Sequence, residues 1–207
     1  MPIKGEKTKE KITRSAAELF RRQGFAATSV NDLLQSAGVK KGSLYFHFPG
    51  KDDLALEVLR QAEEGFMDFL DAALTGPTPA ARLDNFFQCA LEIHRGNGFV
   101  GGCLFGNTAL EASDCNPRYA CRVAEVFDRW SVKIEAVISD AQIEGQIRKD
   151  LPAEVLAQFV VSSVEGGIML ARLKKEEEPL SRCLDSLRIF LELEFEKEKE
   201  HAANYTA

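Results

Sequence analysis

The sequence predicts an all-α fold of about nine helices, arranged as a three-helix head and a larger helical body. Apolar residues recur at intervals of three and four along most of the 207 residues, which is the period of an amphipathic helix. No segment alternates apolar and polar residues for long enough to predict a strand. With 45% hydrophobic and 28% charged residues, the chain is expected to bury a compact core. We expect the head at residues 1–50 and the body at residues 51–207.

The head begins with an amphipathic helix from about Glu6 to Gln23. Gly24 can then adopt the left-handed conformation that ends many helices. Thr28 and Ser29 are both suitable N-caps for a second helix of about two turns. Gly38 is expected to terminate that second helix.

A third short helix is expected from about Lys41 to Phe46, because the proline and glycine at positions 49 and 50 interrupt the chain just after it. Asp52 and Asp53 then favour the start of a long helix, since acidic residues complement the positive end of the helix dipole. This helix should run to about Leu74 and join the head to the body.

The body follows a break at residues 75–79 and contains five further helical patterns. Proline stands near the start of three of them, as helix N-termini favour. The glycine-rich stretch from Gly96 to Gly102 is expected to be the most flexible internal segment. The five patterns lie at about residues 83–91, 103–112, 117–143, 152–174 and 179–199.

Charge is distributed unevenly along the chain. The formal net charge is -6 at pH 7, yet residues 1–51 contain ten Lys or Arg against four Asp or Glu. The first 51 residues therefore carry +6 and the other 156 carry -12. A basic head on an acidic body suits attraction to a polyanion, although solvated helix faces also carry charge.

No segment predicts a membrane span or a secretory leader. The most apolar stretch, Val155 to Ala171, contains several polar residues and is shorter than the roughly 20 residues that a bilayer requires, so we interpret it as a buried helix. Five cysteines without paired spacing are expected to be free thiols in the cytoplasm. The scattered His and Cys residues predict no metal site, and no cofactor is expected.

The segment from Thr28 to Lys51 carries most of the chemical information. Two short helices joined by a tight turn at Gly38 have the spacing of a helix-turn-helix motif, whose second helix enters the major groove of DNA. A purely structural role would instead make Tyr45 and Phe46 core aromatics. On that second helix Leu44 and Phe48 are expected to face inward, and the residues expected to be exposed are Lys40, Lys41, Ser43 and His47.

These residues resemble the tetracycline-repressor family of transcriptional regulators. The resemblance rests on AAELFRRQGF at residues 16–25, TSV at 28–30, AGVKKGSLYFHFPGK at 37–51 and the DDLALEVL that follows. It implies a homodimeric repressor that binds double-stranded operator DNA and is released by a small-molecule effector, rather than an enzyme. Carried over by position, the resemblance implies phosphate contacts from Thr28, Tyr45, His47 and Lys51, base contacts from Lys41, Gly42 and Ser43, and a flanking contact from Lys40.

In the same family the last two long helices pair with those of a second subunit. Here the pattern at residues 179–199 has a broad apolar face, and the helix before it is apolar nearly all round. Gly166 and Gly167 would permit close helix approach. Both features suit a four-helix interface between two subunits, and burial within one subunit is the alternative explanation for the apolar face.

An effector pocket is expected in the body, where aromatic residues are numerous and a few polar side chains could point into a cavity. Most of the aromatic residues are nevertheless expected to belong to the core. The candidate effector-site residues are His94, Cys103, Asn107, Trp130 and Glu165.

Cys103 is the candidate reactive cysteine, because the positive end of a helix that begins there would lower its thiol pKa. The surrounding GGCLFGNTALE resembles a branch of the family that includes the repressor of N-ethylmaleimide reductase, which senses electrophiles and hypochlorite through a cysteine. The lysine that assists that cysteine corresponds to Arg172 here, with Lys174 and Lys175 nearby. Electrophile or oxidant sensing at Cys103 is therefore an alternative, and a small buried residue that lines the pocket is another.

Two other classes of protein, a thiol enzyme and a protein-binding adaptor, fit the sequence less well than a DNA-binding regulator does. A thiol enzyme using Cys103 and His94 would require a base and an oxyanion pocket, which the spacing does not indicate. A helical adaptor that binds proteins could share the body, but it would have no use for a basic recognition helix.

Overall fold

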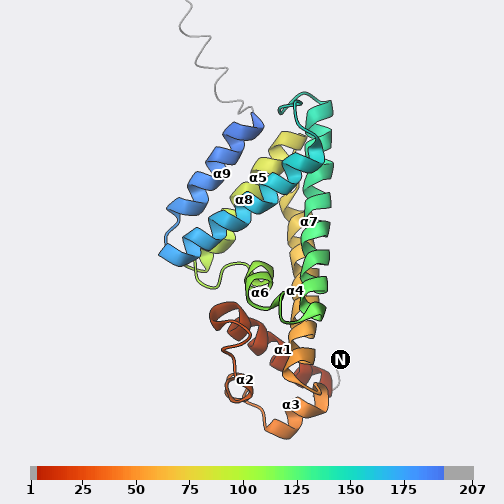
Figure 1. The fold of residues 1–207 in the computed structure, drawn as a ribbon, viewed down its shortest axis with the longest axis vertical. Helices are drawn as coiled ribbons and strands as arrows, with labels where there is room; N and C mark the ends of the chain where they lie inside the picture. The colour runs from red at the N-terminus through yellow and green to blue at the C-terminus, as the bar shows by residue number, and fades with distance from the viewer. Residues whose placement is uncertain (1–3, 194–207) are drawn as a thin grey trace, which may run out of the picture.

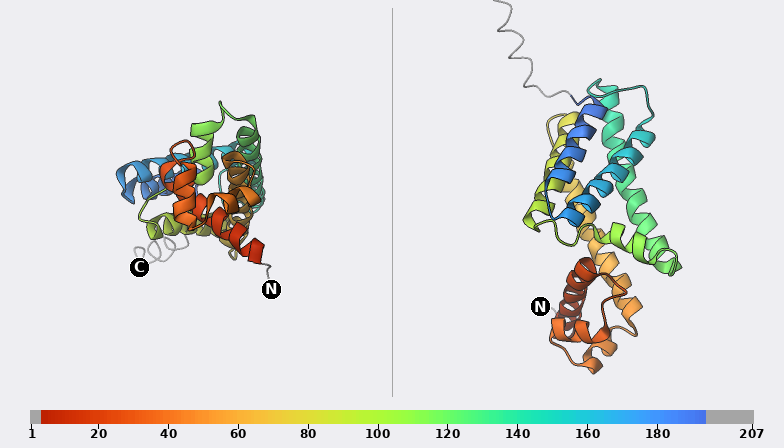
Figure 2. Two further views of the ribbon diagram at one scale, coloured as in Figure 1. Left: turned by 90° about the horizontal axis from the view of Figure 1, so that it is seen from below. Right: turned by 60° about the vertical axis from the view of Figure 1, so that its left-hand side comes forward.

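The computed structural model describes residues 4–193, which fold into nine helices with no strand among them. This confirms the predicted all-α class. Three helices form a head at one end of an elongated molecule, and α4 leads from the head into the body (Figures 1 and 2). The helices are α1 (Lys4–Gln23), α2 (Val30–Ala37), α3 (Lys41–His47), α4 (Lys51–Ala73), α5 (Pro79–Gly96), α6 (Leu104–Ala112), α7 (Pro117–Ile143), α8 (Ala153–Lys174) and α9 (Glu178–Leu191).

Local capping sets the angle between the short helices of the head. Ser29 is the N-cap of α2: its Oγ accepts a hydrogen bond from Asp32 N at 3.1 Å, and Asp32 Oδ2 accepts one from Ser29 N at 2.8 Å. Gly38 ends α2 in a left-handed conformation, with φ 59°. The chain then turns into α3, which packs against α1 and lies at the tip of the head (Figure 1).

The body packs α4, α5, α7, α8 and α9 around an apolar core. α6 lies between α1 of the head and the rest of the body, and it contacts both α1 and α7 (Figure 1). α6 therefore connects the body to the head.

The glycine-rich stretch at residues 96–102 differs from the expectation of a flexible loop. Phe99 is buried, and its backbone N–H donates to the carbonyl of His94 at 2.9 Å. Arg21 of α1 donates to the carbonyl of Val100 at 2.9 Å, and Asn107 donates to that of Gly101 at 2.7 Å. The glycines serve close packing, because a Cβ on Gly101 would collide with the Arg21 guanidinium.

The last helix is shorter than predicted. α9 ends at Leu191, where Glu192 adopts a left-handed conformation, and residues 194–199 of the predicted helix lie outside the described residues. The apolar face of α9 is also largely buried within the subunit, against α8 and α5. Gly167 permits this packing, because a Cβ there would approach Leu180 and Cys183 of α9 to within about 3 Å.

α8 is only partly buried, whereas the sequence predicted a buried helix. Among residues 4–193 it is also the one helix long and apolar enough to cross a membrane by length and composition, a test that core helices of soluble proteins pass as well. One side of α8 packs against α7 and α9. The other side is exposed.

Candidate nucleic-acid interface and ligand cavity

The exposed surface of α3 is the first candidate site. Leu44 and Phe48 are buried and anchor the helix, as predicted. Lys40, Lys41 and Gly42 are exposed at its start. Ser43 and His47 are half-buried, and the Lys41 ammonium lies 5.8 Å from the ring centre of Tyr45.

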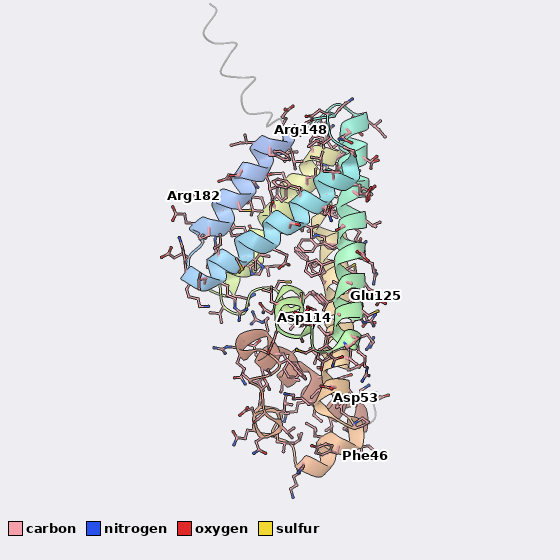
Figure 3. All side chains as sticks on the ribbon, in the orientation of Figure 1. Phe46, Asp53, Asp114, Glu125, Arg148 and Arg182 are labelled. Atoms are coloured by element: carbon pink, nitrogen blue, oxygen red, sulfur yellow. The ribbon has the colours of Figure 1, made fainter. Side chains whose placement is uncertain are left out.

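Phe46 is a surface residue, whereas the purely structural interpretation of the sequence placed it in the core, and it was not among the residues expected to contact DNA. It is 82% exposed and projects from the tip of the head, with its ring edge-on to His47 at 5.0 Å (Figure 3). The sequence could have indicated this exposure. Phe46 is two residues from both Leu44 and Phe48, and residues two apart on a helix do not share a face.

Thr28 and Lys51 hold the turn between α1 and α2 together. The Thr28 side chain is fully buried, and its hydroxyl donates to the carbonyl of Gly24 at 2.6 Å. Lys51 Nζ donates to the carbonyls of Phe25 at 2.9 Å and Thr28 at 3.0 Å, and it lies 4.1 Å from the ring centre of Phe25. Thr28 thus has no exposed side-chain atom for a phosphate, and two of the three Lys51 donors are engaged within the head.

The head and the body meet at a second set of polar contacts. Glu111 of α6 accepts hydrogen bonds from the backbone N–H groups of Phe25 at 2.9 Å and Ala26 at 2.6 Å. Gly24 allows this approach, because a Cβ there would meet the Glu111 carboxylate at 2.9 Å. We call this contact the Glu111 clamp. Sequence reasoning missed it because its partners are more than eighty residues apart.

A cavity of about 210 Å³ lies within the body. The Phe66 ring packs at 5.2 Å from Trp130 and at 5.7 Å from Phe105, so aromatic surface forms much of its wall. Four of the five predicted effector-site residues line it. The lining consists of Phe66, Phe69, Phe86, Ala90, Ile93, His94, Cys103, Leu104, Phe105, Trp130, Val164, Glu165 and Ile168.

Asn107, the fifth predicted residue, lines an adjoining hollow of about 370 Å³ instead. The side-chain oxygen of Asn107, Oδ1, accepts a short hydrogen bond from Arg172 of α8. Cys103, Glu165 and Ile168 line both spaces and therefore stand at their boundary. The Arg172 guanidinium is thus hydrogen-bonded to Asn107, and Arg172 and Cys103 line the same hollow.

Burial shifts the polar groups of the cavity towards their uncharged forms. Burial raises the pKa of the Glu165 carboxyl, and burial together with the nearby Arg21 charge lowers the pKa of His94. Burial, with the negative charge of Glu165, raises the pKa of the Cys103 thiol well above its usual range. The expectation of a lowered pKa at Cys103 is therefore wrong, because desolvation outweighs the backbone hydrogen bonds that it accepts at the start of α6.

Two buried polar atoms of the cavity lining have no hydrogen-bond partner in the protein: Trp130 Nε1 and Glu165 Oε1. Trp130 is only 3% exposed. Glu165 packs closely on α6, because a Cβ on Gly106 would collide with its other carboxylate oxygen, Oε2. Both residues line the cavity, and buried polar atoms without a partner are uncommon in proteins.

An apolar surface remains exposed on α8 and near the end of α9. Leu173 is 75% exposed and Ile189 is 80% exposed. Phe159 is half exposed, with its ring 4.7 Å from that of Phe190. We call this the α8–α9 apolar surface; its exposed members are Val155, Phe159, Met169, Leu170, Leu173 and Ile189.

Comparison with known protein families matches both parts of the chain. Residues 12–58 match the family described as bacterial regulatory proteins, tetR family. Residues 79–187 match the tetracyclin repressor-like C-terminal domain. The second match alone covers more than half of the chain, and the first spans the α2–α3 motif.

Individual relatives agree with the family match. An HTH-type transcriptional regulator of Mycobacterium tuberculosis is 32% identical, over 88% of this chain and 93% of that protein. The HTH-type transcriptional repressor DhaR of a Mycobacterium species is 28% identical, over 85% of this chain and 88% of DhaR. A crystal structure of a regulatory protein TetR from Rhodobacter sphaeroides superposes with a TM-score of 0.83 at 27% identity, covering 87% of this chain and 97% of that one.

None of these matches singles out the branch related to the repressor of N-ethylmaleimide reductase, so that finer assignment stays a prediction. The exposed basic start of α3, the helical body with its cavity and the two family matches all point to one class of protein. The chain belongs to the TetR family and is a DNA-binding transcriptional regulator.

Proposed function

We propose that this regulator is a homodimeric repressor that leaves its operator when a small molecule occupies the aromatic cavity. Regulators of this family bind operator DNA, act as dimers and respond to small-molecule effectors. The proposal assigns DNA binding to residues 1–50 and effector binding and dimerisation to residues 51–207. It places the protein in the cytoplasm with its DNA, and it assigns the chain no catalytic role.

The observation that carries the proposal is the exposed surface of α3. Lys41 and Ser43 are assigned to base edges in the major groove, and the open backbone at Gly42 suits close approach of the DNA. Phe46 is added to the interface because of its exposure. Phosphate contacts are assigned to Lys40, Tyr45 and His47. We assign Thr28 and Lys51 a positioning role, a proposal supported by the hydrogen bonds that their polar groups make within the head.

Dimerisation is assigned to the α8–α9 apolar surface. Contiguous exposed apolar side chains on a soluble protein favour an interface, and the side chains here come from two neighbouring helices. A two-fold axis would set one copy of this surface against the same surface of the other copy. Each subunit would then present one α3 to successive major grooves, about one helical turn of DNA (roughly 34 to 36 Å) or a multiple of it apart.

The proposed function is tested by fluorescence anisotropy on the DNA immediately upstream of the protein's own gene, with a shuffled duplex as control. We expect tight binding of two subunits to the upstream DNA alone, with an affinity that falls steeply as salt rises. The variant Lys41→Ala should weaken this binding, whereas Lys149→Ala, an exposed change in the body, should not. Equal weak binding to both duplexes would contradict an operator at this site.

A further inference from the structure

We propose that the effector is a compact, uncharged ring compound whose single hydroxyl group donates a hydrogen bond to Glu165 and accepts one from Trp130. This inference rests on the proposed effector role of the aromatic cavity and names the chemical class that the cavity takes. The size of the cavity, its walls and its two orphan polar atoms each restrict the class.

The cavity has room for about one ring. The cavity measures about 210 Å³. An apolar cavity of about 150 Å³ in another protein holds benzene, so the space here fits one six-membered ring with a few additional atoms.

The walls favour an apolar, flat molecule. Phe66 and Trp130 meet in a T-shaped arrangement at 5.2 Å, and Phe86 lies 6.2 Å from Trp130 with a similar geometry. Val164 and Ile168 of α8 supply aliphatic surface. A ring between such side chains gains both edge-to-face contacts and burial of apolar area.

The orphan polar atoms require a group that both donates and accepts. Trp130 Nε1 carries a hydrogen and can only donate, while the unpartnered Oε1 of Glu165 can accept both in the carboxylate and as the carbonyl oxygen of the neutral carboxyl. A hydroxyl group is the smallest substituent that can donate a hydrogen bond to Glu165 and accept one from Trp130. An ammonium group would leave Trp130 without an acceptor, and a carboxylate would have nothing to donate to Glu165.

The electrostatics of the cavity disfavour a charged ligand. His94 is held towards its neutral form, and the surrounding rings cannot replace the hydration of an ion. A negative ligand would also meet the carboxyl of Glu165. An uncharged hydroxyl loses less hydration on entry, and hydrogen bonds to the two orphan atoms would offset that loss.

The chain contains a single tryptophan, Trp130, so its fluorescence reports the cavity directly. We would excite the dimer at the red edge of tryptophan absorption and titrate four probes that share one ring: phenol, toluene, benzylammonium and benzoate. Phenol is expected to saturate the signal with a dissociation constant about tenfold below that of toluene, with the two ions weaker still.

The variant Glu165→Leu should abolish the preference for phenol while it still binds toluene, which shows that the cavity remains folded. Glu154→Leu, an exposed change on the same helix, is the matched control and should behave like the parent protein. Tighter binding of toluene or benzylammonium than of phenol would overturn the inference, as would a response to none of the four probes. Phenol binding that leaves operator DNA bound would support the ligand class and contradict the proposed release mechanism.

Discussion

The Glu111 clamp makes a sharp prediction about how the body positions the head. Glu111 lies near the end of α6, and its carboxylate accepts from two consecutive backbone N–H groups between α1 and α2. The variant Glu111→Ala removes both hydrogen bonds and leaves the head tied to the body through α4, the Arg21 hydrogen bond to Val100 and the ring contact of Phe25 with Tyr119. We expect this variant to bind operator DNA more weakly, because its two heads are less firmly set at the operator spacing.

The magnitude follows from the exposure of the clamp. A hydrogen bond to a charged group contributes about 1.5 to 3 kcal/mol when it is well formed. Glu111 is exposed, so water replaces the lost partners and only a fraction survives as a net effect. We expect about 1 kcal/mol per subunit, or about 2 kcal/mol for the two clamps of the dimer, which corresponds to roughly a thirtyfold higher dissociation constant.

The assay is anisotropy on the upstream duplex, with Asp114→Ala as the control. Asp114 is an exposed acid just beyond α6, and its label in Figure 3 lies close to the head. Removing either acid reduces repulsion of the DNA, so the charge change alone should strengthen binding in both variants. Weaker binding by Glu111→Ala with unchanged or stronger binding by Asp114→Ala would support the clamp. An equal gain in affinity for both variants would refute it.

Three further predictions test other parts of the molecule. Phe46→Ala should weaken operator binding several-fold in the anisotropy assay. Its melting temperature should not fall, because a ring that is 82% exposed adds little to stability. A lower melting temperature would indicate that Phe46 belongs to the core. Mild peroxide should leave operator affinity unchanged in both the parent protein and Cys103→Ser, since burial keeps the Cys103 thiol protonated. If peroxide weakened operator binding by the parent protein but not by Cys103→Ser, the thiol-sensor alternative would be restored. Hydrogen bonds from Arg60 lower the pKa of Glu57 from its usual 4.5 to about 2. The stabilisation that Glu57 contributes should therefore be present above pH 4.5 and lost as the pH falls towards 2. The free energy of unfolding of Glu57→Gln, measured with urea, should depend less on pH than that of the parent protein.

The fold could be predicted largely because its signals are local. Apolar periodicity and caps such as Ser29 and Gly38 act within a few residues, so helix positions follow from sequence windows. The left-handed residue that ends α9 is Glu192, which is not a residue type that signals a helix end. The predicted continuation to residue 199 therefore had no local signal against it.

The site was predicted less completely, because a residue type does not reveal its partner. Lys51 suits a phosphate by charge, yet its amine bonds two carbonyls of the turn that precedes α2. Cys103 stands at a helix start, but α8 brings Glu165 over it, and the resulting burial reverses the expected pKa shift. Sequence alone identified four residues of the cavity wall, while its volume and its orphan atoms depend on packing between distant helices.

The contacts of α4 and α6 determine how a signal can pass from the cavity to the head. α4 is tied to α7, because Tyr119 donates to Asp52 at 3.0 Å and the buried Glu63 pairs with Arg122 at 3.2 Å. Breaking a buried ion pair is strongly unfavourable, so α4 resists independent movement. α6 has its first residues in the cavity wall and holds the head through an exposed carboxylate. α6 therefore joins the cavity wall to the head, and under the proposed release mechanism a ligand that displaces its first residues would strain the Glu111 clamp.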